Sequence, residues 1–541
     1  MPAHADASHP TWDVFADHWL AVDALGRVLP RPEDCPPRPG RHVGMFYFLT
    51  HKPGGDGPHD VSKIIAANPA DPAFLPNKAH HWGEPEFGTY ASTDPWVIRR
   101  HGEMLADAGV DTIIFDVTND VSFPEVTDAI VREWSRMRRE GERTPQFCYL
   151  ASKESVRQVW EHVYKPRRHE ELWFQWKGRP VLLFGQHIGM GAAEDFPEEI
   201  QRFFTLRASW AWDSLPWYRD GQRQWPWVVH HPQCIGWDKD RAVPEQVPVA
   251  TGQHPLSNIG RSFHDGAQPP TDEQFLCDQT PLGLCFQEQW ERAHDVGPEF
   301  VFVTGWNEWT AGCVVMGEDV QKCLEHWCFF PGAQLGLAGR ALRPGDKYFI
   351  DQFNQEFSRD IEPMRGGHRD NYYRQLVANV RRYKGARPLS APFAASSAAI
   401  EGAIARWDSV PALFRNHLGD GAARDWPGVG STGQLTRPEA TNRIVHARVA
   451  HDDEAVLFLV ETRDVIRDVQ ARDGMLLFIN ADGDHATGWE GFDVLVNLDA
   501  RADGTTSIHT WRDGLWQPVA RVPMEVRGTR LAISVPPGGL P

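Results

Sequence analysis

Short apolar runs alternate with stretches of helical periodicity through most of the first 385 residues. Eight of these runs have the pattern of strands buried on both faces, and they span residues 43–49, 112–116, 146–150, 180–185, 203–210, 247–251, 300–304 and 347–351. The helical stretches carry start signals such as Thr93-Asp94-Pro95, where a capping side chain precedes a first-turn proline. This alternation predicts an α/β fold, a closed parallel (β/α)8 barrel (TIM barrel), in preference to a doubly wound sheet.

The hydrophobic period changes from helical to alternating in the last third of the chain. Residues 386–400 are rich in Pro, Ala and Ser and predict a linker. Beyond them, alternating runs at 444–450, 455–461, 475–480, 492–497, 507–511 and 530–535 are separated by turn residues. We therefore expect an N-terminal extension over 1–40, a barrel over 41–385 and a smaller β-sandwich domain over 401–541.

The charge balance narrows the class of partner. The formal net charge is −18, which repels nucleic acid and anionic membrane surfaces at long range. No apolar run is long enough to span a membrane. The 23 tryptophans are a surplus that favours flat, hydroxylated ligands, although extra packing is the alternative. A carbohydrate is therefore the expected partner, with no nucleic acid and no membrane.

Cysteine usage and the N-terminus bear on the environment of the protein. The eight cysteines include no Cys-x-x-Cys pair, so free buried thiols are expected in place of a zinc cluster or a disulfide scaffold. Residues 1–31 lack the basic start and the continuous apolar core of a signal peptide. The sequence as written predicts a cytoplasmic location, or a secreted one if a leader was removed.

The strand predicted at 300–304 is followed by two indoles that flank an amide and a carboxylate: Trp306, Asn307, Glu308 and Trp309. In a parallel barrel, groups at the C-terminal ends of the strands form the active site. Indoles can stack on sugar rings, and a partly desolvated Glu308 can hold or deliver a proton near neutral pH. The alternative is a strand end whose tryptophans cap the core and whose glutamate binds an arginine.

The same rule applied to the other strands gives an acid-rich set of catalytic candidates. Two carboxylates that flank a glycosidic bond can hydrolyse it, because one protonates the leaving oxygen and the other attacks or activates water. The distance between them decides between retention and inversion of the anomeric centre. The catalytic candidates are Glu308, Asp116, Asp351 and Glu356.

A second group of residues is predicted to bind the substrate. The tryptophans are candidate sugar platforms, with core packing as their alternative, and the histidines are candidate donors to hydroxyl groups. Arg359 is a candidate clamp for a uronate or sulfate, with a structural salt-bridge network over 356–365 as the alternative. The set comprises His81, Trp82, Trp212, Asp213, His254, Trp306, Asn307, Trp309 and Arg359.

No metal and no organic cofactor are predicted. The pair His80 and His81 lies in a polar loop, where such a pair is usually solvated. The oxygen-rich stretch 480–484, followed by Asp493, resembles a calcium loop, but it lacks the full calcium-binding pattern and is more typical of an Asp-Gly turn.

Two stretches carry a resemblance to known proteins. Thr304-Gly-Trp-Asn-Glu-Trp309 resembles the Trp-Asn-Glu-Trp signature of barrel glycoside hydrolases related to endo-α-mannosidase and the WbsX-like proteins, and His80-His-Trp82 resembles a substrate-loop motif there. The resemblance implies a retaining mechanism with two glutamates three residues apart, of which Glu308 matches the first and Ala311 stands at the second. The tail is similar to carbohydrate-binding sandwiches allied to family-nine binding modules.

These observations predict a glycoside hydrolase that acts on a polysaccharide or oligosaccharide by a carboxylate acid/base mechanism. A polysaccharide lyase acting next to a uronate is the first alternative. A carbohydrate-binding barrel without catalysis is the second, and Ala311 is the main argument for it. Whether cleavage is internal or terminal stays open.

Overall fold

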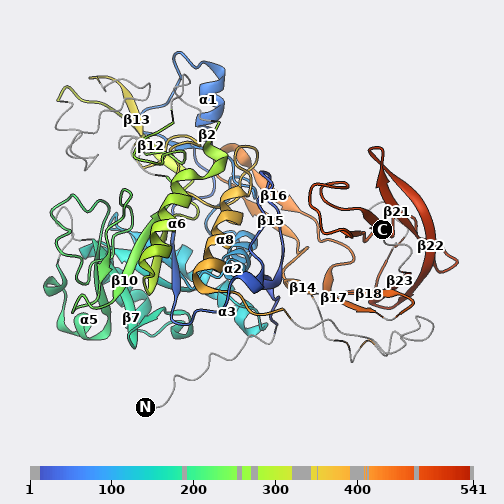
Figure 1. The fold of residues 1–541 in the computed structure, drawn as a ribbon. Coiled ribbons are helices and arrows are strands. Elements are labelled where there is room, and N and C mark those ends of the chain that lie inside the picture. Colours follow the sequence, from blue (N-terminus) through green and yellow to red (C-terminus); the bar gives the residue numbers. More distant parts are fainter. Residues whose placement is uncertain are drawn as a thin grey trace. The chain divides into compact units, whose positions relative to one another are not determined.

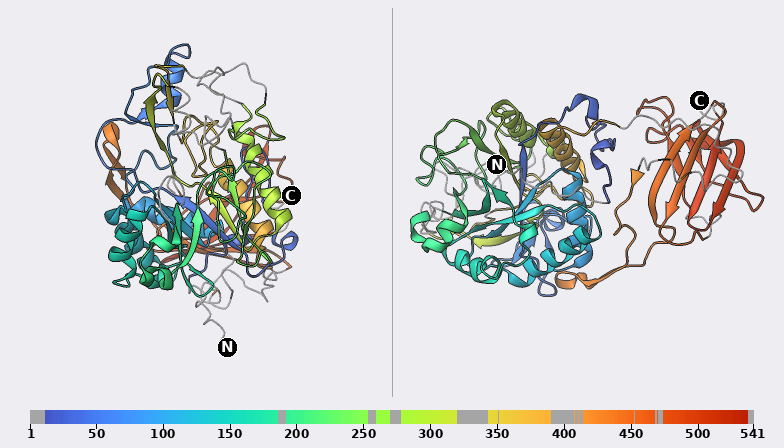
Figure 2. Two further views of the ribbon diagram at one scale, coloured as in Figure 1. Left: turned by 90° about the vertical axis from the view of Figure 1, so that its left-hand side faces the viewer. Right: turned by 90° about the horizontal axis from the view of Figure 1, so that it is seen from below.

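The structure is a computed structural model, and it describes residues 12–185, 192–252, 259–269, 278–319, 343–349, 351–389, 407, 410, 414–451, 453–467, 469 and 474–536. The chain forms two compact units (Figures 1 and 2). The larger unit comprises Ala16–Pro388 and Asp425–Thr436, and the smaller unit comprises Met1–Phe15, Leu389–Arg424 and Arg437–Pro541. The short segment 425–436 therefore belongs with the larger unit, although it follows the predicted linker.

A curled parallel sheet forms the centre of the larger unit (Figure 2). Seven of its strands are parallel, in the order β8, β7, β5, β4, β1, β11 and β10. They confirm seven of the eight strands predicted from the apolar runs. Two short strands, β6 and β9, pair antiparallel with β7 and β10. The bounds are β1 His42–Tyr47, β4 Thr112–Val117, β5 Gln146–Ala151, β6 Gln175–Trp176, β7 Arg179–Gly185, β8 Thr205–Ser209, β9 Gly236–Trp237, β10 Pro244–Ala250 and β11 Phe300–Thr304.

Helices follow the strands and cover the outer face of the sheet. Helix α2 starts as predicted, because the Asp94 side chain accepts bonds from the first-turn amides and Pro95 occupies the first helical position. The helices of this unit are α1 Val61–Ala67, α2 Pro95–Asp107, α3 Pro124–Arg139, α4 Lys153–Val159, α5 Glu198–Phe203, α6 Leu284–Val296 and α8 Asn371–Lys384. None of the helices in the described part of the chain is long and apolar enough to cross a membrane.

The outermost parallel strands of the curled sheet, β8 and β10, both bond the segment 224–228 or are followed by residues that do. Trp225 N donates to Ala208 O at 2.8 Å, and Trp212 N donates to Val228 O at 2.7 Å. From the other side, the Gln246 side chain donates to Pro226 O at 2.8 Å. The contacts along this segment are isolated bridges and not a ladder. The α/β class is therefore confirmed, whereas a full eight-stranded barrel is not shown.

The predicted strand at 347–351 is wrong as a member of the parallel sheet. β13 (Lys347–Phe349) pairs antiparallel with β12 (Thr310–Val315), which in turn pairs with β3 (Ala79–His81) and, beyond it, β2 (His59–Asp60). An apolar run of this length specifies burial but not its partner. Ala311 lies in β12 and packs with Phe349 and Phe353, so the position that aligns with a second glutamate is a packing position here.

The alternation of side chains along the parallel strands builds two cores. In β1, Val43, Met45 and Tyr47 pack outward with the helices, while Phe46 points into the interior of the curled sheet. The interior cluster is largely aromatic and includes Phe302, Trp225 and Trp227. Burial on both faces is what the continuous apolar runs predict.

An ion pair is buried within the curled sheet at Glu245 of β10. Its carboxylate accepts two bonds from Arg207 at 2.7 Å and bonds from the indoles of Trp176 and Trp225 at 2.9 and 2.8 Å, and Lys177 Nζ lies 2.9 Å away. Burial, the largest single influence, acts to raise the pKa of Glu245, but the donors led by Arg207 outweigh it and lower the pKa to about 2.

Replacing Glu245 with alanine is expected to destabilise the larger unit by about 3–5 kcal/mol, because it leaves the Arg207 charge buried without a partner. In the folded protein the pKa of Glu245 lies below its ordinary value of 4.5. The stabilisation that the Glu245 carboxylate provides is therefore fully present above pH 4.5 and is lost as the pH falls toward 2. Urea unfolding at several pH values measures both effects. A Glu245→Ala protein as stable as the wild type at pH 7 would contradict this account.

The smaller unit contains one antiparallel sheet in the order β14, β17, β18, β23, β22, β21, β20, β19. The six strands predicted in the tail are confirmed, and β22 is an additional long strand. β22 pairs with β21 over residues 515–523 and with β23 over residues 524–527, and so it joins the eight strands into one path of pairing. The sandwich arrangement is not confirmed. The bounds are β14 Phe414–Arg415, β17 Ile444–His451, β18 Val456–Thr462, β19 Leu477–Ile479, β20 Val494–Val496, β21 Thr505–Arg512, β22 Leu515–Arg527 and β23 Arg530–Val535.

A hairpin of β15 (Arg424–Pro427) and β16 (Gln434–Arg437) joins the segment 425–436 to the larger unit. Gly54 N donates to Gly428 O at 3.0 Å, and Val429 N donates to Thr89 O at 2.8 Å. Leu435 packs on the cluster that contains Tyr90 and Trp309. Among the described cysteines, Cys35, Cys148, Cys234, Cys285 and Cys313 are free thiols.

Candidate active site

The loop after β11 is fixed to the neighbouring strand β1. Trp306 N donates to Phe46 O at 2.8 Å. The Asn307 amide both accepts from Phe48 N, at 2.9 Å, and donates to Phe48 O, at 3.1 Å. Asn307 thus acts as a bridge between the ends of two parallel strands, and it sets the position of the carboxylate that follows.

Glu308 lies at the C-terminal edge of the sheet with its side chain 11% exposed. Its backbone N donates to Asp360 Oδ1 at 2.8 Å. Its Oε2 accepts from Gln352 Nε2 at 3.0 Å and from Arg359 Nη2 at 2.5 Å. Both donors end on Oε2, so within the described structure Oε1 is the oxygen available to a ligand. Burial raises the pKa of Glu308 well above its usual range, Arg359 opposes the shift, and Asp351 and Asp360 add to it.

Three of the four catalytic candidates gather around Arg359. Asp351 Oδ1 lies 3.6 Å from Arg359 Nη2, and its side chain is 49% exposed. Asp116, at the end of β4, is close enough that Asp351 and Arg359 both influence its titration. Burial is the largest cause that raises the pKa of Asp116, against the bonds to its Oδ1 from Thr118. The structure therefore brings together Glu308, Asp116 and Asp351.

Glu356 lies apart from this group, contrary to its place among the catalytic candidates. Its carboxylate accepts bonds from Ser262 N at 3.0 Å, from Ser262 Oγ at 2.8 Å and from Thr280 Oγ1. Burial is the main cause that raises its pKa, and the residue is 4% exposed. These bonds tie the segment after β13 to the residues before α6, which is a structural role.

Trp227 contacts the cluster, although the sequence did not single it out. The Arg359 guanidinium lies 5.2 Å from the centre of the Trp227 ring, which stacks on Phe46 at 5.1 Å. Trp227 lies in the segment between β8 and β10. The proline in its Trp-Pro-Trp sequence argues against a strand, so the extended conformation of this segment is not predicted. The alternation of Trp225 and Trp227 ahead of Val228 and Val229 is the signal that could have found it.

The predicted tryptophan platforms are mostly core residues. Trp82, Trp306 and Trp309 are each 1% exposed or less. Trp82 and Trp309 stack on one another at 4.3 Å, and the Trp82 indole donates to Glu308 O at 2.9 Å. Trp82 therefore holds the backbone at Glu308, and none of the three buried indoles offers a face to a sugar. The packing alternative holds for these three side chains.

The remaining predicted substrate residues are dispersed. Trp212, just after β8, is 4% exposed and packs edge-on against His230, while the neighbouring Asp213 is exposed. His81 in β3 is buried, and burial lowers its pKa to about 3, so it is neutral near pH 7. Both ring nitrogens of His80 bond backbone groups, of Leu75 and Lys78. His254 lies outside the described residues.

Asp360 and Glu362, which the sequence placed in a salt-bridge network, hold the loop that carries Glu308. Asp360 bonds Glu308 N and the Gln352 side chain. The fully buried Glu362 carboxylate accepts from the Trp309 indole at 2.5 Å and from Tyr90 OH at 2.7 Å, and it bonds His101 Nε2 at 2.9 Å. Glu362 N donates to Trp306 O at 3.0 Å. Glu362 therefore fixes the residues on either side of Asn307 and Glu308.

Replacing Glu362 with glutamine is expected to lower kcat about 10- to 100-fold with little change in KM, because it loosens the loop without touching substrate. The circular dichroism couplet of the stacked Trp82–Trp309 pair should weaken in parallel. Tyr90→Phe removes one bond to Glu362 and leaves the Trp309 bond, so it should have a smaller effect on both readouts. An unchanged couplet together with unchanged kcat would show that Glu362 has no positioning role.

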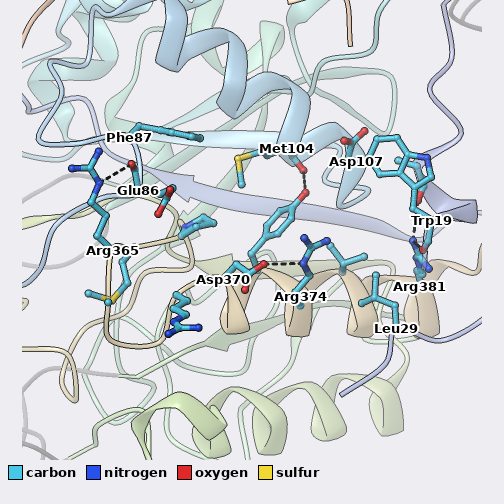
Figure 3. A pocket seen from close by; sticks show the side chains of 17 residues that line it. Trp19, Leu29, Glu86, Phe87, Met104, Asp107, Arg365, Asp370, Arg374 and Arg381 are labelled. Atoms are coloured by element: carbon cyan, nitrogen blue, oxygen red, sulfur yellow. Dashed lines mark hydrogen bonds and ion pairs between the residues drawn. The ribbon is translucent and has the colours of Figure 1, made fainter. Parts of the chain in front are cut away.

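A separate cavity of about 680 Å³ lies between α2 and α8 (Figure 3). Its wall is largely apolar, with Met104, Tyr373 and Val377 among its residues. Several of its charged groups are already bonded, since Arg374 pairs with Asp370 at 3.0 Å and Arg381 donates to Trp19 O at 2.7 Å. None of the carboxylates around Arg359 lines this cavity.

Comparison with known proteins gives structural likenesses only. No protein-family model matches the chain, and no curated protein matches it. Similar solved structures include two of the GH99 endo-α-mannosidase from Bacteroides thetaiotaomicron, one in complex with bis-tris-propane and one without it. Each matches 64% of this chain at a TM-score of 0.34 and 14% identity. The match covers 99% of the chain in the complex and 98% of the other chain. A glycoside hydrolase-like protein matches at a TM-score of 0.36 and 9% identity, over 64% of this chain and 99% of its own. The endo-α-mannosidase is of the group that the Trp306–Trp309 motif resembles, but likeness at this level transfers no residue's role.

Proposed function

We propose that the protein is a glycoside hydrolase and that its active site is the carboxylate cluster around Arg359. The observation that carries the proposal is the grouping of Glu308, Asp351 and Asp116 at the C-terminal edge of a curled parallel sheet. In barrel enzymes this edge carries the chemistry. We also infer that the segment 224–228 completes the sheet as an eight-stranded barrel, since it bonds the outermost parallel strands on both sides.

Glu308 is the proton donor in this proposal. Gln352 and Arg359 occupy Oε2, so the proton of the neutral carboxyl resides on Oε1 and can pass to the leaving glycosidic oxygen. Burial raises the pKa of Glu308, and this shift favours the protonated form that a general acid needs. After the proton has moved, the Arg359 guanidinium stabilises the carboxylate that remains.

Asp351 is the second carboxylate. Arg359 Nη2 contacts both acids, which limits the separation of Glu308 Oε2 from Asp351 Oδ1 to about 6 Å. Separations near 5–5.5 Å are typical of retaining enzymes, whereas inverting enzymes need a wider gap for water. We therefore propose that Asp351 attacks the anomeric carbon as the bond to the protonated oxygen breaks, and that Glu308 then deprotonates the water that releases the sugar.

Asp116 orients the substrate in this scheme. Thr118 N and Oγ1 both donate to its Oδ1, which fixes the carboxylate and leaves Oδ2 to accept a sugar hydroxyl. Trp227 beneath Arg359 contributes an aromatic surface to the same site. No step in this scheme requires a metal or an organic cofactor.

The proposal is tested by incubating the wild-type protein with a panel of plant, fungal and bacterial glycans and measuring released reducing ends. Absorbance of unsaturated products is recorded in the same reactions. New reducing ends without unsaturation support the hydrolase. Unsaturated products would instead establish a lyase, and glycan binding without any cleavage would establish a carbohydrate-binding protein.

A further inference from the structure

The sheet of the smaller unit has an aromatic cluster on the face opposite its core. Side chains alternate between the two faces of a strand. Leu477 and Ile479 of β19 pack into the core cluster with Val494 and Val496, so Phe478 between them points to the other face. These aromatic positions are unusual, because the outward face of a single sheet is expected to be polar.

Four further rings join Phe478 on this face. Trp511 of β21 and Trp516 of β22 are directly opposite one another in the strand pairing, with ring centres 5.2 Å apart. From the loop before β20, Trp489 lies 5.2 Å and Phe492 lies 5.7 Å from Phe478. We call these five residues the aromatic face. Trp489 and Phe492 remain 39% and 36% exposed.

A tight turn fixes the two most exposed rings. Trp489 N donates to Phe492 O at 2.8 Å, and Phe492 N donates to Trp489 O at 2.9 Å. The two residues between them, Glu490 and Gly491, both have positive φ, as in a type I′ turn. The backbone that carries these two rings is therefore fixed before any ligand arrives, which reduces the entropy lost on binding.

The loop beside the aromatic face is rich in acids, and its basic side chain is a histidine, His485. Between 474 and 500 the chain has Asp482, Asp484, Glu490, Asp493 and Asp499 but no lysine or arginine. The first four lie in the loop from β19 to β20, and backbone and hydroxyl donors of that loop hold it together, including Ala481 N to Asp493 Oδ2 at 2.9 Å and Thr487 Oγ1 to Asp482 Oδ2 at 2.9 Å. This loop is thus an internally bonded turn, and we assign no calcium to it.

The geometry points to a binding site for a neutral glycan on the aromatic face. Flat rings match the C–H faces of pyranose sugars, and carboxylates accept bonds from sugar hydroxyls. The acids repel anionic polymers such as nucleic acid or polyuronate. They also disfavour a second copy of the chain, because two acidic loops would then face each other. This site is separate from the carboxylate cluster and does not depend on cleavage.

Binding is measured by affinity electrophoresis of the full-length Glu308→Gln protein in gels that contain neutral polysaccharides: mannan, xylan or β-glucan. Trp489→Ala in that background should weaken retardation by the bound polysaccharide about tenfold, and Trp489→Phe should restore most of it. Leu515→Ala is the matched control, because Leu515 is 66% exposed in the adjoining hairpin but not aromatic, and it should bind as the parent does. Thermal unfolding checks that the variants fold.

The outcomes separate this inference from the proposed hydrolase. Loss of binding in Trp489→Ala supports the aromatic face even if no glycan is cleaved. Equal binding by Trp489→Ala and its parent overturns it even if the wild type is an active hydrolase. An equal loss in Leu515→Ala, or a change of oligomeric state in Trp489→Ala by gel filtration, would overturn it in favour of an apolar contact between protein chains. Retention on an anionic polyuronate and not on neutral glycans would also overturn it.

Discussion

Glu308→Gln is expected to lower kcat by about 100- to 10,000-fold, because the amide keeps the shape of the side chain and cannot donate the proton. The bonds from Gln352 and Arg359 to Oε2 can persist to the amide oxygen, so the protein should remain folded. Since the protonated form of Glu308 is the active one, wild-type activity should fall as the pH rises through its raised pKa. Initial rates between pH 4 and 9 on the cleaved glycan measure both effects.

The matched control for Glu308→Gln is Glu356→Gln. Both glutamates are buried and both have a pKa raised mainly by burial, but Glu356 bonds Ser262 and Thr280, away from Arg359. Glu356→Gln should reduce stability and leave kcat and the alkaline limb of the pH profile unchanged. The opposite pattern, with activity lost in Glu356→Gln and retained in Glu308→Gln, would refute the assignment of the proton donor.

Asp351→Gly is expected to lower kcat roughly 1,000-fold or more, because it removes the group that attacks the anomeric carbon. Azide added to this variant should restore turnover, since the small anion can enter the space left by the carboxylate and attack from the same side. The product is then a glycosyl azide whose anomeric configuration is opposite to that of the substrate. Nuclear magnetic resonance of the product measures that configuration directly.

Asp116→Gly tests the alternative choice of nucleophile. If Asp116 orients a hydroxyl, its loss should raise KM and should not be rescued by azide. Rescue of Asp116→Gly, and none of Asp351→Gly, would transfer the nucleophile role to Asp116. An inverted product from the wild type would reject a covalent intermediate on either acid.

The sequence predicted the carboxylate at the end of β11 more reliably than its surroundings. The continuous run from Phe300 to Thr304 specifies a strand buried on both faces, and such a strand must end at the edge of the sheet where Glu308 lies. Trp306 and Trp309 were harder to place. Periodicity ends with the strand, so nothing in the sequence says that Trp306 packs edge-on against His101 in the outer core or that Trp309 stacks on Trp82.

Two other errors have related physical causes. The run 347–351 is apolar enough to be a strand, but pairing with β12 depends on residues far away in the sequence. The segment 224–228 was missed because Pro226 lacks the amide that a central strand needs, and its neighbours bond through isolated bridges. The sequence predicts a polar network that includes Asp360 and Glu362. It does not identify their partners, because these lie in the loop after β11, about 50 residues earlier in the chain.

The hairpin of β15 and β16 affects how this protein can be divided. The chain leaves the larger unit after Pro388, returns at Asp425–Thr436, and leaves again. No single cut separates the two units, because a stop after the predicted linker also removes Leu435 from its place against Gly88. The smaller unit cannot be exchanged between proteins as a simple C-terminal fusion, and recombination would have to carry the hairpin or replace its contacts.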